Sequence, residues 1–193
     1  MHIAIIPGHG HRSRNGAYRY DPGAVSSLGQ EADIVRDVAA AVKRLGGSRG
    51  SIHDSPGGGP YTYGSRRYAA HQAIGKGPGV VCHLHVNAGG GRYLLSMFDP
   101  RSATGEKYAL GWSLQAESQF SGQRGLSKAK CLPAARPTWN NAANLIEPSY
   151  SSTPAGVAAV LLEIGFIDNP AHAPMLTGEG IAKQAQAIWS AWR

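Results

Sequence analysis

Short apolar runs indicate where strands are expected along the chain. Residues 2–6 read "HIAII", and longer apolar runs occur at 79–88, "GVVCHLHVNA", and at 157–166, "VAAVLLEIGF". Continuous apolar runs of this length are typical of strands that are buried on both faces of a sheet. Weaker strands are expected at 50–54, "GSIHD", and at 92–98, "RYLLSMF".

Helical periodicity begins after a long polar loop that follows the first strand. Apolar residues recur at every third or fourth position from Leu28 to Leu45, which is the spacing of one helix face. Gly46 and Gly47 then end the pattern, as glycines commonly do at helix C-termini. Glu31 falls in the first turn, where a carboxylate interacts favourably with the helix dipole.

Further helices alternate with the strands. They are expected at 65–74, 103–119 and 178–192, whereas 121–153 lacks regular periodicity and suits a substrate-facing loop or short strands. Strands that alternate with helices predict an α/β fold. We therefore expect a single domain over residues 1–193, with a mixed, mostly parallel central sheet flanked by helices.

The composition agrees with one compact domain. The chain has 193 residues, of which 42% are hydrophobic, and this suffices for one core. Its two cysteines, Cys82 and Cys131, are too few for a disulfide scaffold. No run approaches the ~20 apolar residues of a membrane span, and the apolar stretch after His2 is too short for a signal-peptide core. We expect cytoplasmic synthesis without a signal peptide and no membrane insertion.

Basic residues outnumber acidic residues by 19 to 12, which gives a formal net charge of +7. Such a charge favours polyanionic surroundings, whether nucleic acid, anionic lipid or the acidic polymers of a bacterial envelope. The basic residues are scattered, and no segment reads as a known nucleic-acid-binding module. We therefore expect no specific nucleic-acid partner, and we expect a monomer.

One carboxylate lies inside the apolar run at 157–166. Burying an unpaired charge costs several kcal/mol even after the protein relaxes, so Glu163 requires compensation. An ion pair with Arg66 or Arg67 is one explanation. A divalent metal nearby, or a role in proton transfer, is the other.

Histidines gather near two strand ends. His9 follows the first strand, and His85 comes late in 79–88, as Glu163 does in its own strand. Ligands of α/β sheets bind at the carboxyl ends of the strands, so these side chains are expected at one edge of the sheet. Two imidazoles and one carboxylate, with a position left open for water, form a ligand set of catalytic zinc. The candidate ligands are His9 or His11, Glu31, and His83 or His85.

The period of two in a strand separates the side chains of 79–88 into two sets. His83, His85 and Asn87 share one face, and Cys82 lies on the other face. A cysteine hydrolase that uses Cys82 is an alternative, but its thiol is expected to point away from the histidines.

Five strings of the sequence are informative together: "IAIIPGHG", "DPGA", "GQE", "HLHVNA" and "LLEIGF.DN". In their order and intervals they resemble the zinc-dependent N-acetylmuramoyl-L-alanine amidases of the type-3 amidase family, over nearly the whole chain. By this resemblance His9, Glu31 and His85 match the zinc ligands, and Glu163 matches the catalytic glutamate. The implied cofactor is Zn2+.

The resemblance also implies supporting residues and leaves differences. Asn87 matches the family's asparagine after the second histidine, and Arg66 resembles a family arginine ahead of an "AN" pair. His83 is expected on the same face of the strand as His85, so it is a candidate to replace His85 as a ligand or to form a hydrogen bond with a ligand. The departures from the family pattern are Ile6 for aspartate, His11 for glycine, His83 for serine and His71 for asparagine.

The implied reaction is hydrolysis of the amide that joins the lactyl group of N-acetylmuramic acid to L-alanine in peptidoglycan. Zinc lowers the pKa of its bound water toward about 7 and polarises the carbonyl. Glu163 accepts the proton of the water and returns it to the leaving amine. Without an export signal, the expected protein is a phage endolysin that acts on the cell wall after release, with no separate wall-binding domain.

Other functions remain open from the sequence. A bacterial autolysin of the same activity and a related zinc peptidase would use the same residues. A non-catalytic basic protein that binds the envelope or nucleic acid would use only the charge, and binding alone does not require Glu163 or the paired histidines.

Overall fold

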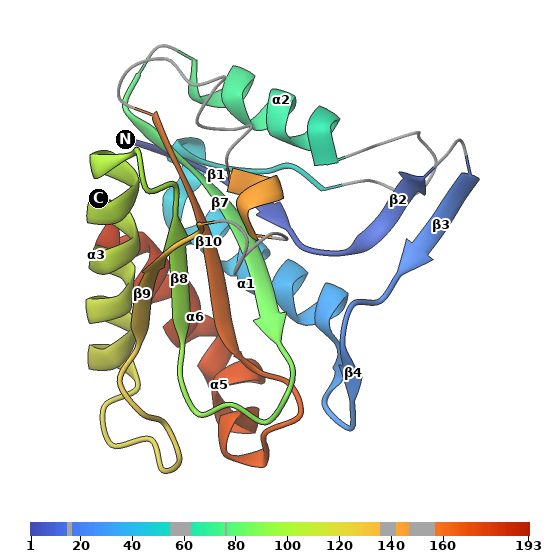
Figure 1. The fold of residues 1–193 in the computed structure, drawn as a ribbon, viewed down its shortest axis with the longest axis vertical. Coiled ribbons are helices and arrows are strands. Elements are labelled where there is room, and N and C mark those ends of the chain that lie inside the picture. Colours follow the sequence, from blue (N-terminus) through green and yellow to red (C-terminus); the bar gives the residue numbers. More distant parts are fainter. Residues whose placement is uncertain (15–16, 55–62, 76, 136–141, 147–156) are drawn as a thin grey trace.

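A six-stranded sheet forms the centre of the computed structural model, which describes residues 1–14, 17–54, 63–75, 77–135, 142–146 and 157–193 (Figure 1). The strand order is β6-β1-β7-β10-β8-β9. Strands β6, β1, β7 and β10 run parallel, β8 pairs antiparallel with β10, and β9 runs parallel to β8. The predicted α/β fold with a mixed, mostly parallel sheet is confirmed. The strands are β1 (His2–Pro7), β6 (Gly50–Ile52), β7 (Gly79–Asn87), β8 (Leu95–Phe98), β9 (Lys130–Pro133) and β10 (Val157–Phe166).

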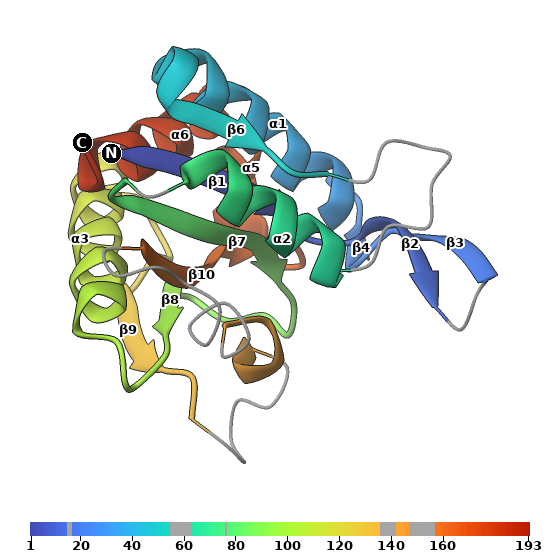
Figure 2. The same cartoon turned by 90° about the horizontal axis from the view of Figure 1, so that it is seen from above.

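Helices cover both faces of this sheet (Figures 1 and 2). On one face, apolar side chains of α1, α3, α5 and α6 pack against Cys82 and Leu84 of β7. On the other face, Ala70 of α2 belongs to a second apolar cluster with Ile6 and Val81. Among the described residues, no helix combines the length and the apolar character that crossing a membrane requires. The helices are α1 (Glu31–Gly46), α2 (Tyr63–Ile74), α3 (Ala103–Gln119), α5 (Ala173–Leu176) and α6 (Glu179–Ala191), with short 3-10 turns η1 (Gly47–Arg49) and η2 (Pro170–His172).

The polar loop after β1 carries two small hairpins that its sequence did not reveal. One pairs β2 (Gly10–Arg14) with β3 (Ala17–Asp21) and projects from the sheet, and the other pairs β4 (Val25–Ser26) with β5 (Gly29–Gln30). Helix α1 therefore begins at Glu31, and Leu28 lies in the turn before it, although its side chain still packs on the core. The helix ends as expected, with Gly47 at the C-cap and a φ of 54°.

The order of the parallel strands reverses direction at β1. Strand β1 lies between β6 and β7, and the chain passes from β1 through α1 to β6, then through α2 to β7. The connections therefore lead to opposite sides of β1, and ligands of α/β sheets bind at the carboxyl ends of strands where such a reversal occurs. His9 follows β1 directly and His85 lies near the end of β7, so both histidines are at this point.

Candidate metal centre

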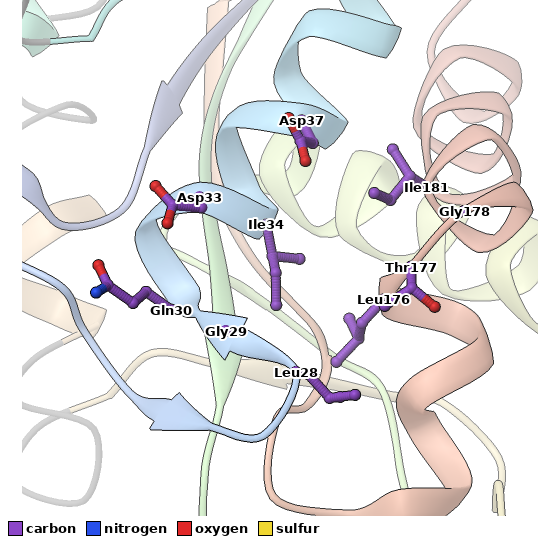
Figure 3. Close-up of a pocket in the computed structure, with 10 residues that line it drawn as sticks. All are labelled: Leu28, Gly29, Gln30, Asp33, Ile34, Asp37, Leu176, Thr177, Gly178 and Ile181. Atoms are coloured by element: carbon purple, nitrogen blue, oxygen red, sulfur yellow. The ribbon is translucent and has the colours of Figure 1, made fainter.

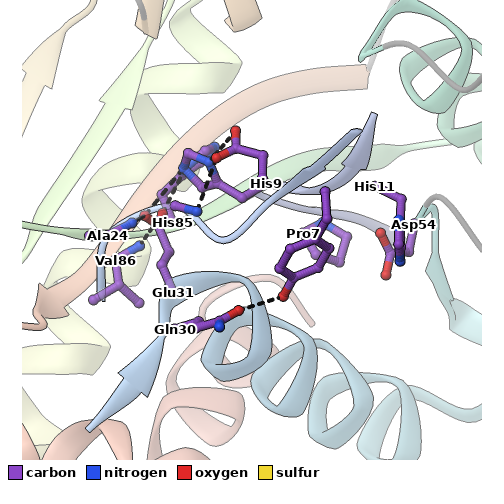
Figure 4. A network of polar contacts seen from close by, with 12 residues as sticks. Pro7, His9, His11, Ala24, Gln30, Glu31, Asp54, His85 and Val86 are labelled. Carbon is purple, nitrogen blue, oxygen red and sulfur yellow. Dashed lines mark hydrogen bonds and ion pairs between the residues drawn. The ribbon is translucent and has the colours of Figure 1, made fainter. Parts of the chain in front are cut away.

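His9, Glu31 and His85 meet at the carboxyl edge of the sheet (Figure 4). Each offers a ligand atom, and these atoms all lie within 4.8 Å of one another. Within the described ranges, this is the one group of three or more such side chains close enough to hold one ion. The candidate ligands that the sequence singled out are thus brought together from the end of β1, the first turn of α1 and β7.

Glu31 holds the centre of the cluster with both carboxylate oxygens. Oε1 accepts a hydrogen bond from the backbone N–H of Val86 at 3.0 Å and lies 3.1 Å from Nδ1 of His85. Oε2 accepts from the N–H of Ala24 at 3.0 Å and lies 3.2 Å from Nε2 of His9. Burial opposes the charge, but the hydrogen bonds with His85 and His9 outweigh it and hold the pKa of Glu31 well below its usual range. Glu31 is therefore an anion at neutral pH, which suits a metal ligand.

A second carboxylate orients His9. Oδ2 of Asp21, at the end of β3, lies 3.0 Å from Nδ1 of His9, which directs Nε2 toward Glu31. Burial disfavours the imidazolium, but hydrogen bonds to Glu31 and Asp21 raise the pKa of His9 to about 8. Carboxylates that hold a histidine ring in this manner are common behind metal ligands. Asp21 is the first residue of the string "DPGA", and its contact with His9 has no signal in the sequence.

The backbone around the cluster is specialised. His9 has a φ of 60°, and it is the one non-glycine residue with positive φ in the described part of the chain. A Cβ on Gly8 would lie 2.5 Å from the ring of His85, and a Cβ on Gly23 would lie 2.6 Å from Oε2 of Glu31. Both glycines thus leave room for the side chains of the cluster, and strain at His9 is typical of functional sites.

His85 completes a donor set that fits a divalent metal. Its ring meets that of His9 edge-on, with 5.2 Å between the ring centroids. Its Nε2 is buried and has no hydrogen-bond partner among the described atoms, whereas buried polar atoms are almost always paired. Two imidazoles and one carboxylate with such an unpaired nitrogen suit an ion of the zinc type.

Glu163 lies beside the cluster on the neighbouring strand. In the parallel pairing of β10 with β7, Glu163 is opposite His85. Its Oε2 is buried without a partner, and neither Arg66 nor Arg67 forms an ion pair with it in the described structure. Burial, reinforced by the charge of Glu31 and opposed by His85, raises the pKa of Glu163 to about 7. A carboxyl group of this kind can both accept and donate a proton near neutral pH.

The supporting residues take different positions. His83 lies outside the cluster, fully buried between Ile6 and Leu161 in the strand register, and burial lowers its pKa to about 3. Asn87 accepts a hydrogen bond from the N–H of Ala88 at 2.8 Å through its own Oδ1. The ring of His11 packs against that of Tyr20, with 5.1 Å between centroids. Roles of His83, Asn87 and His11 in the reaction stay predictions.

Two further residues bear on the alternatives. Cys82 packs in the apolar core on the face opposite to His83 and His85, as the period of two predicted, and burial raises the pKa of its thiol. Arg66 is buried on α2, where it donates hydrogen bonds to the backbone carbonyls of Pro7, His9 and His11.

A pocket of about 280 Å³ lies between the start of α1 and the turn from α5 to α6 (Figure 3). Ile34 and Leu176 point into it, and Asp33 and Asp37 lie along its α1 wall. Ile34 and Leu176 belong to the core on the α1 face, whereas the neighbours of Glu163 on its side of β10 belong to the core on the α2 face. The pocket therefore lies on the face of the sheet opposite to Glu163.

Comparison with solved structures identifies the fold. The sequence matches no family model and no curated protein. The structure is similar to the N-acetylmuramoyl-L-alanine amidase AmiC2 of Nostoc punctiforme, with a TM-score of 0.69 and 17% identity over 98% of this chain and 93% of that one. The catalytic domain of the amidase CwlV from Bacillus (Paenibacillus) polymyxa var. colistinus gives 0.64 and 17% over 99% and 96%. The catalytic domain of CD27L, an endolysin that targets Clostridia Difficile, gives 0.63 and 22% over 97% and 96%. The chain has the fold of these catalytic domains over nearly its whole length.

Proposed function

We propose that this chain is a zinc-dependent N-acetylmuramoyl-L-alanine amidase that hydrolyses the lactyl–L-alanine amide of peptidoglycan. One observation carries the proposal: His9, Glu31 and His85 converge within 4.8 Å, and Glu163 stands opposite His85 on the next strand. The fold shared with proteins named as amidases of this specificity supports the same reaction. The sequence strings that resemble the type-3 family contain all four residues.

His9, Glu31 and His85 would hold the ion. Their donor atoms are those that zinc accepts in catalytic sites with three protein ligands. A divalent metal in this position supplies Lewis acidity, which polarises the scissile carbonyl and favours attack by water. Asp21 keeps the ring of His9 oriented through the 3.0 Å contact at Nδ1.

Glu163 moves the proton. As a carboxylate it accepts a proton from the attacking water while the new C–O bond forms. As a carboxylic acid it then donates that proton to the alanine nitrogen while the C–N bond breaks, so the products are a lactyl carboxylate and a free amine. A pKa raised to about 7 by burial suits both directions of transfer.

The charge of the chain fits the proposed substrate. A net charge of +7 attracts a protein to the acidic polymers of a bacterial envelope, with no need for a specific anion site. The likeness to the catalytic domain of an endolysin leads us to favour an endolysin over an autolysin of the same activity. On this proposal the protein is made in the cytoplasm and acts on the wall after release.

Digestion of purified peptidoglycan tests the proposal. We expect the protein to release stem peptides with new L-alanine amino termini, identified by mass spectrometry, and we expect a chelator to stop the release. The His9→Ala variant should lose both activity and bound zinc, measured by elemental analysis.

Three outcomes would contradict the proposal, each in a different way. New termini inside the stem peptide would indicate a zinc peptidase. Release that continues at full rate in chelator would exclude a metal-dependent reaction. No release at all, together with salt-sensitive binding to DNA, would favour a binding protein that uses only the basic surface.

A further inference from the structure

The segment that presents His9 has a backbone that requires external support. His9 and Gly10 have consecutive positive φ angles of 60° and 81°. For a residue with a Cβ, such a conformation costs of order 1–3 kcal/mol and persists only where the surroundings enforce it. The side chain of His9 can therefore keep its direction only if residues 7–11 are held from outside.

Arg66, on α2, supplies that support through hydrogen bonds to the backbone of this segment. Its Nη1 donates to the carbonyl oxygens of Pro7 at 3.0 Å and His9 at 3.2 Å, and its Nη2 donates to that of His11 at 2.7 Å. The side chain is 2% exposed, so the guanidinium itself is shielded from water, and its hydrogen bond to Pro7 is fully buried. One planar guanidinium thus fixes three alternate carbonyls of the segment that surrounds His9.

A second arginine, Arg36 of α1, lies against the same segment. Asp54, which follows β6, accepts a hydrogen bond from Nε of Arg36 at 2.5 Å and lies 3.8 Å from Nη1 of Arg66. A Cβ on Gly10 would lie 1.9 Å from Nη2 of Arg36. The backbone of residues 7–11 is therefore enclosed by Arg66 from α2, by Arg36 from α1 and by the carboxylate that joins them.

We infer that Arg66 is a positioning residue for the metal ligand His9. Its rigid fork holds the strained backbone, and Asp21 holds the ring, so Nε2 is directed at the ion before the ion arrives. A buried guanidinium is a poor way to gain stability alone, because apolar packing of equal volume stabilises at least as well. Lysine has no planar fork and cannot satisfy three carbonyls in this geometry. The inference rests on the proposed function only in that the cluster binds a metal.

Metal affinity of the purified protein tests this assignment. We would measure the Kd for Zn2+ by competition with a chromophoric chelator, and the absorption spectrum of the Co2+-substituted protein, for Arg66→Met, Arg66→Lys and the wild type. Arg67→Met is the matched control, because it removes a guanidinium from the next position of the same helix. Melting temperatures of the metal-free proteins would be recorded in parallel.

We expect Arg66→Met to bind Zn2+ about 10–100-fold more weakly, as is typical when a group supporting a metal ligand is removed. Arg66→Lys should fall between Arg66→Met and the wild type, and the Co2+ spectrum should change in both variants. The affinity of Arg67→Met should stay within about threefold of the wild type.

The outcomes distinguish failure of the Arg66 assignment from failure of the proposed function. If both Arg66 variants melt at lower temperature but keep the wild-type Zn2+ affinity and Co2+ spectrum, Arg66 serves only the fold and the inference is wrong. Failure of both variants to fold would overturn it as well. A wild type that binds no Zn2+ would instead remove the proposed function, whereas a wild type that binds Zn2+ and cleaves peptidoglycan leaves that function standing in either case.

Discussion

Acid should destabilise the metal-free protein through His83. This side chain is fully buried, and both ring nitrogens lack a partner among the described atoms. Burial, with smaller contributions from His85 and nearby arginines, lowers its pKa to about 3 from the ordinary histidine value of 6.5. The unfolded chain therefore binds a proton in a range of pH where the folded chain does not, and stability falls as the pH drops from 6.5 toward 3.

The size of the effect follows from the two pKa values. Between pH 7 and pH 4.5, a histidine that titrates at 6.5 in the unfolded state and at about 3 in the folded state removes about 2–3 kcal/mol of stability. This is a large share of the ~5–15 kcal/mol by which domains are stable. Replacement of His83 by leucine, which does not titrate, should remove this part of the pH dependence.

Urea denaturation in the presence of chelator measures the difference. The free energy of unfolding of the wild type should drop by about 2–3 kcal/mol more than that of His83→Leu when the pH is lowered from 7 to 4.5. Cys82→Ala is the matched control, because Cys82 is the neighbouring buried residue and its thiol, with a raised pKa, stays uncharged in this range. His53, whose pKa burial lowers to about 4, titrates equally in all three proteins. Equal losses in the wild type and His83→Leu would refute a neutral, buried His83.

Three further predictions concern the site. Glu163→Gln should lower turnover of peptidoglycan by about 10²–10⁴-fold while zinc content, measured by elemental analysis, stays at the wild-type level; loss of zinc would mean that Glu163 acts on the metal instead. Gly23→Ala should weaken Zn2+ binding by more than about tenfold, because its Cβ would lie 2.6 Å from Oε2 of Glu31. Gly29→Ala shares the positive φ but has nothing within 4 Å, so an equal effect there would show that backbone strain alone matters. Cys82→Ala should retain chelator-sensitive hydrolysis, and its inactivity would revive a thiol mechanism.

The sequence predicted the sheet and helices well because their apolar patterns are strong. The buried runs at 79–88 and 157–166 became the two central strands, and both sit where a two-sided core requires apolar side chains. The apolar periodicity predicts a helix from Leu28, three residues before α1 begins, because Leu28 packs on the core from a turn and so mimics a helical position. Side-chain spacing reports burial, and it cannot tell a helix from a turn that buries the same residue.

The site was predictable as a set of residues, but its supports were not. The residues alone left His9 or His11 and His83 or His85 open, and the resemblance to the type-3 family singled out His9, Glu31, His85 and Glu163. The structure brings the first three together and places Glu163 opposite His85. Asp21 and Arg66 act through a ring nitrogen and through backbone carbonyls, and such contacts depend on where the chain returns in space. Backbone acceptors are present at every position, so the sequence has no signal for the three that Arg66 binds.

The pairing of β10 with β7 has a consequence for redesign. Because Glu163 and His85 are neighbours in a hydrogen-bonded ladder, the spacing between the proposed proton carrier and the proposed metal ligand is set by the register of two central strands. A shift of one position along either strand would turn one of the two side chains to the opposite face of the sheet. Glu163 and His85 can therefore lie side by side only in the observed register. Redesign of substrate preference should therefore change surface loops and leave β7 and β10 unaltered.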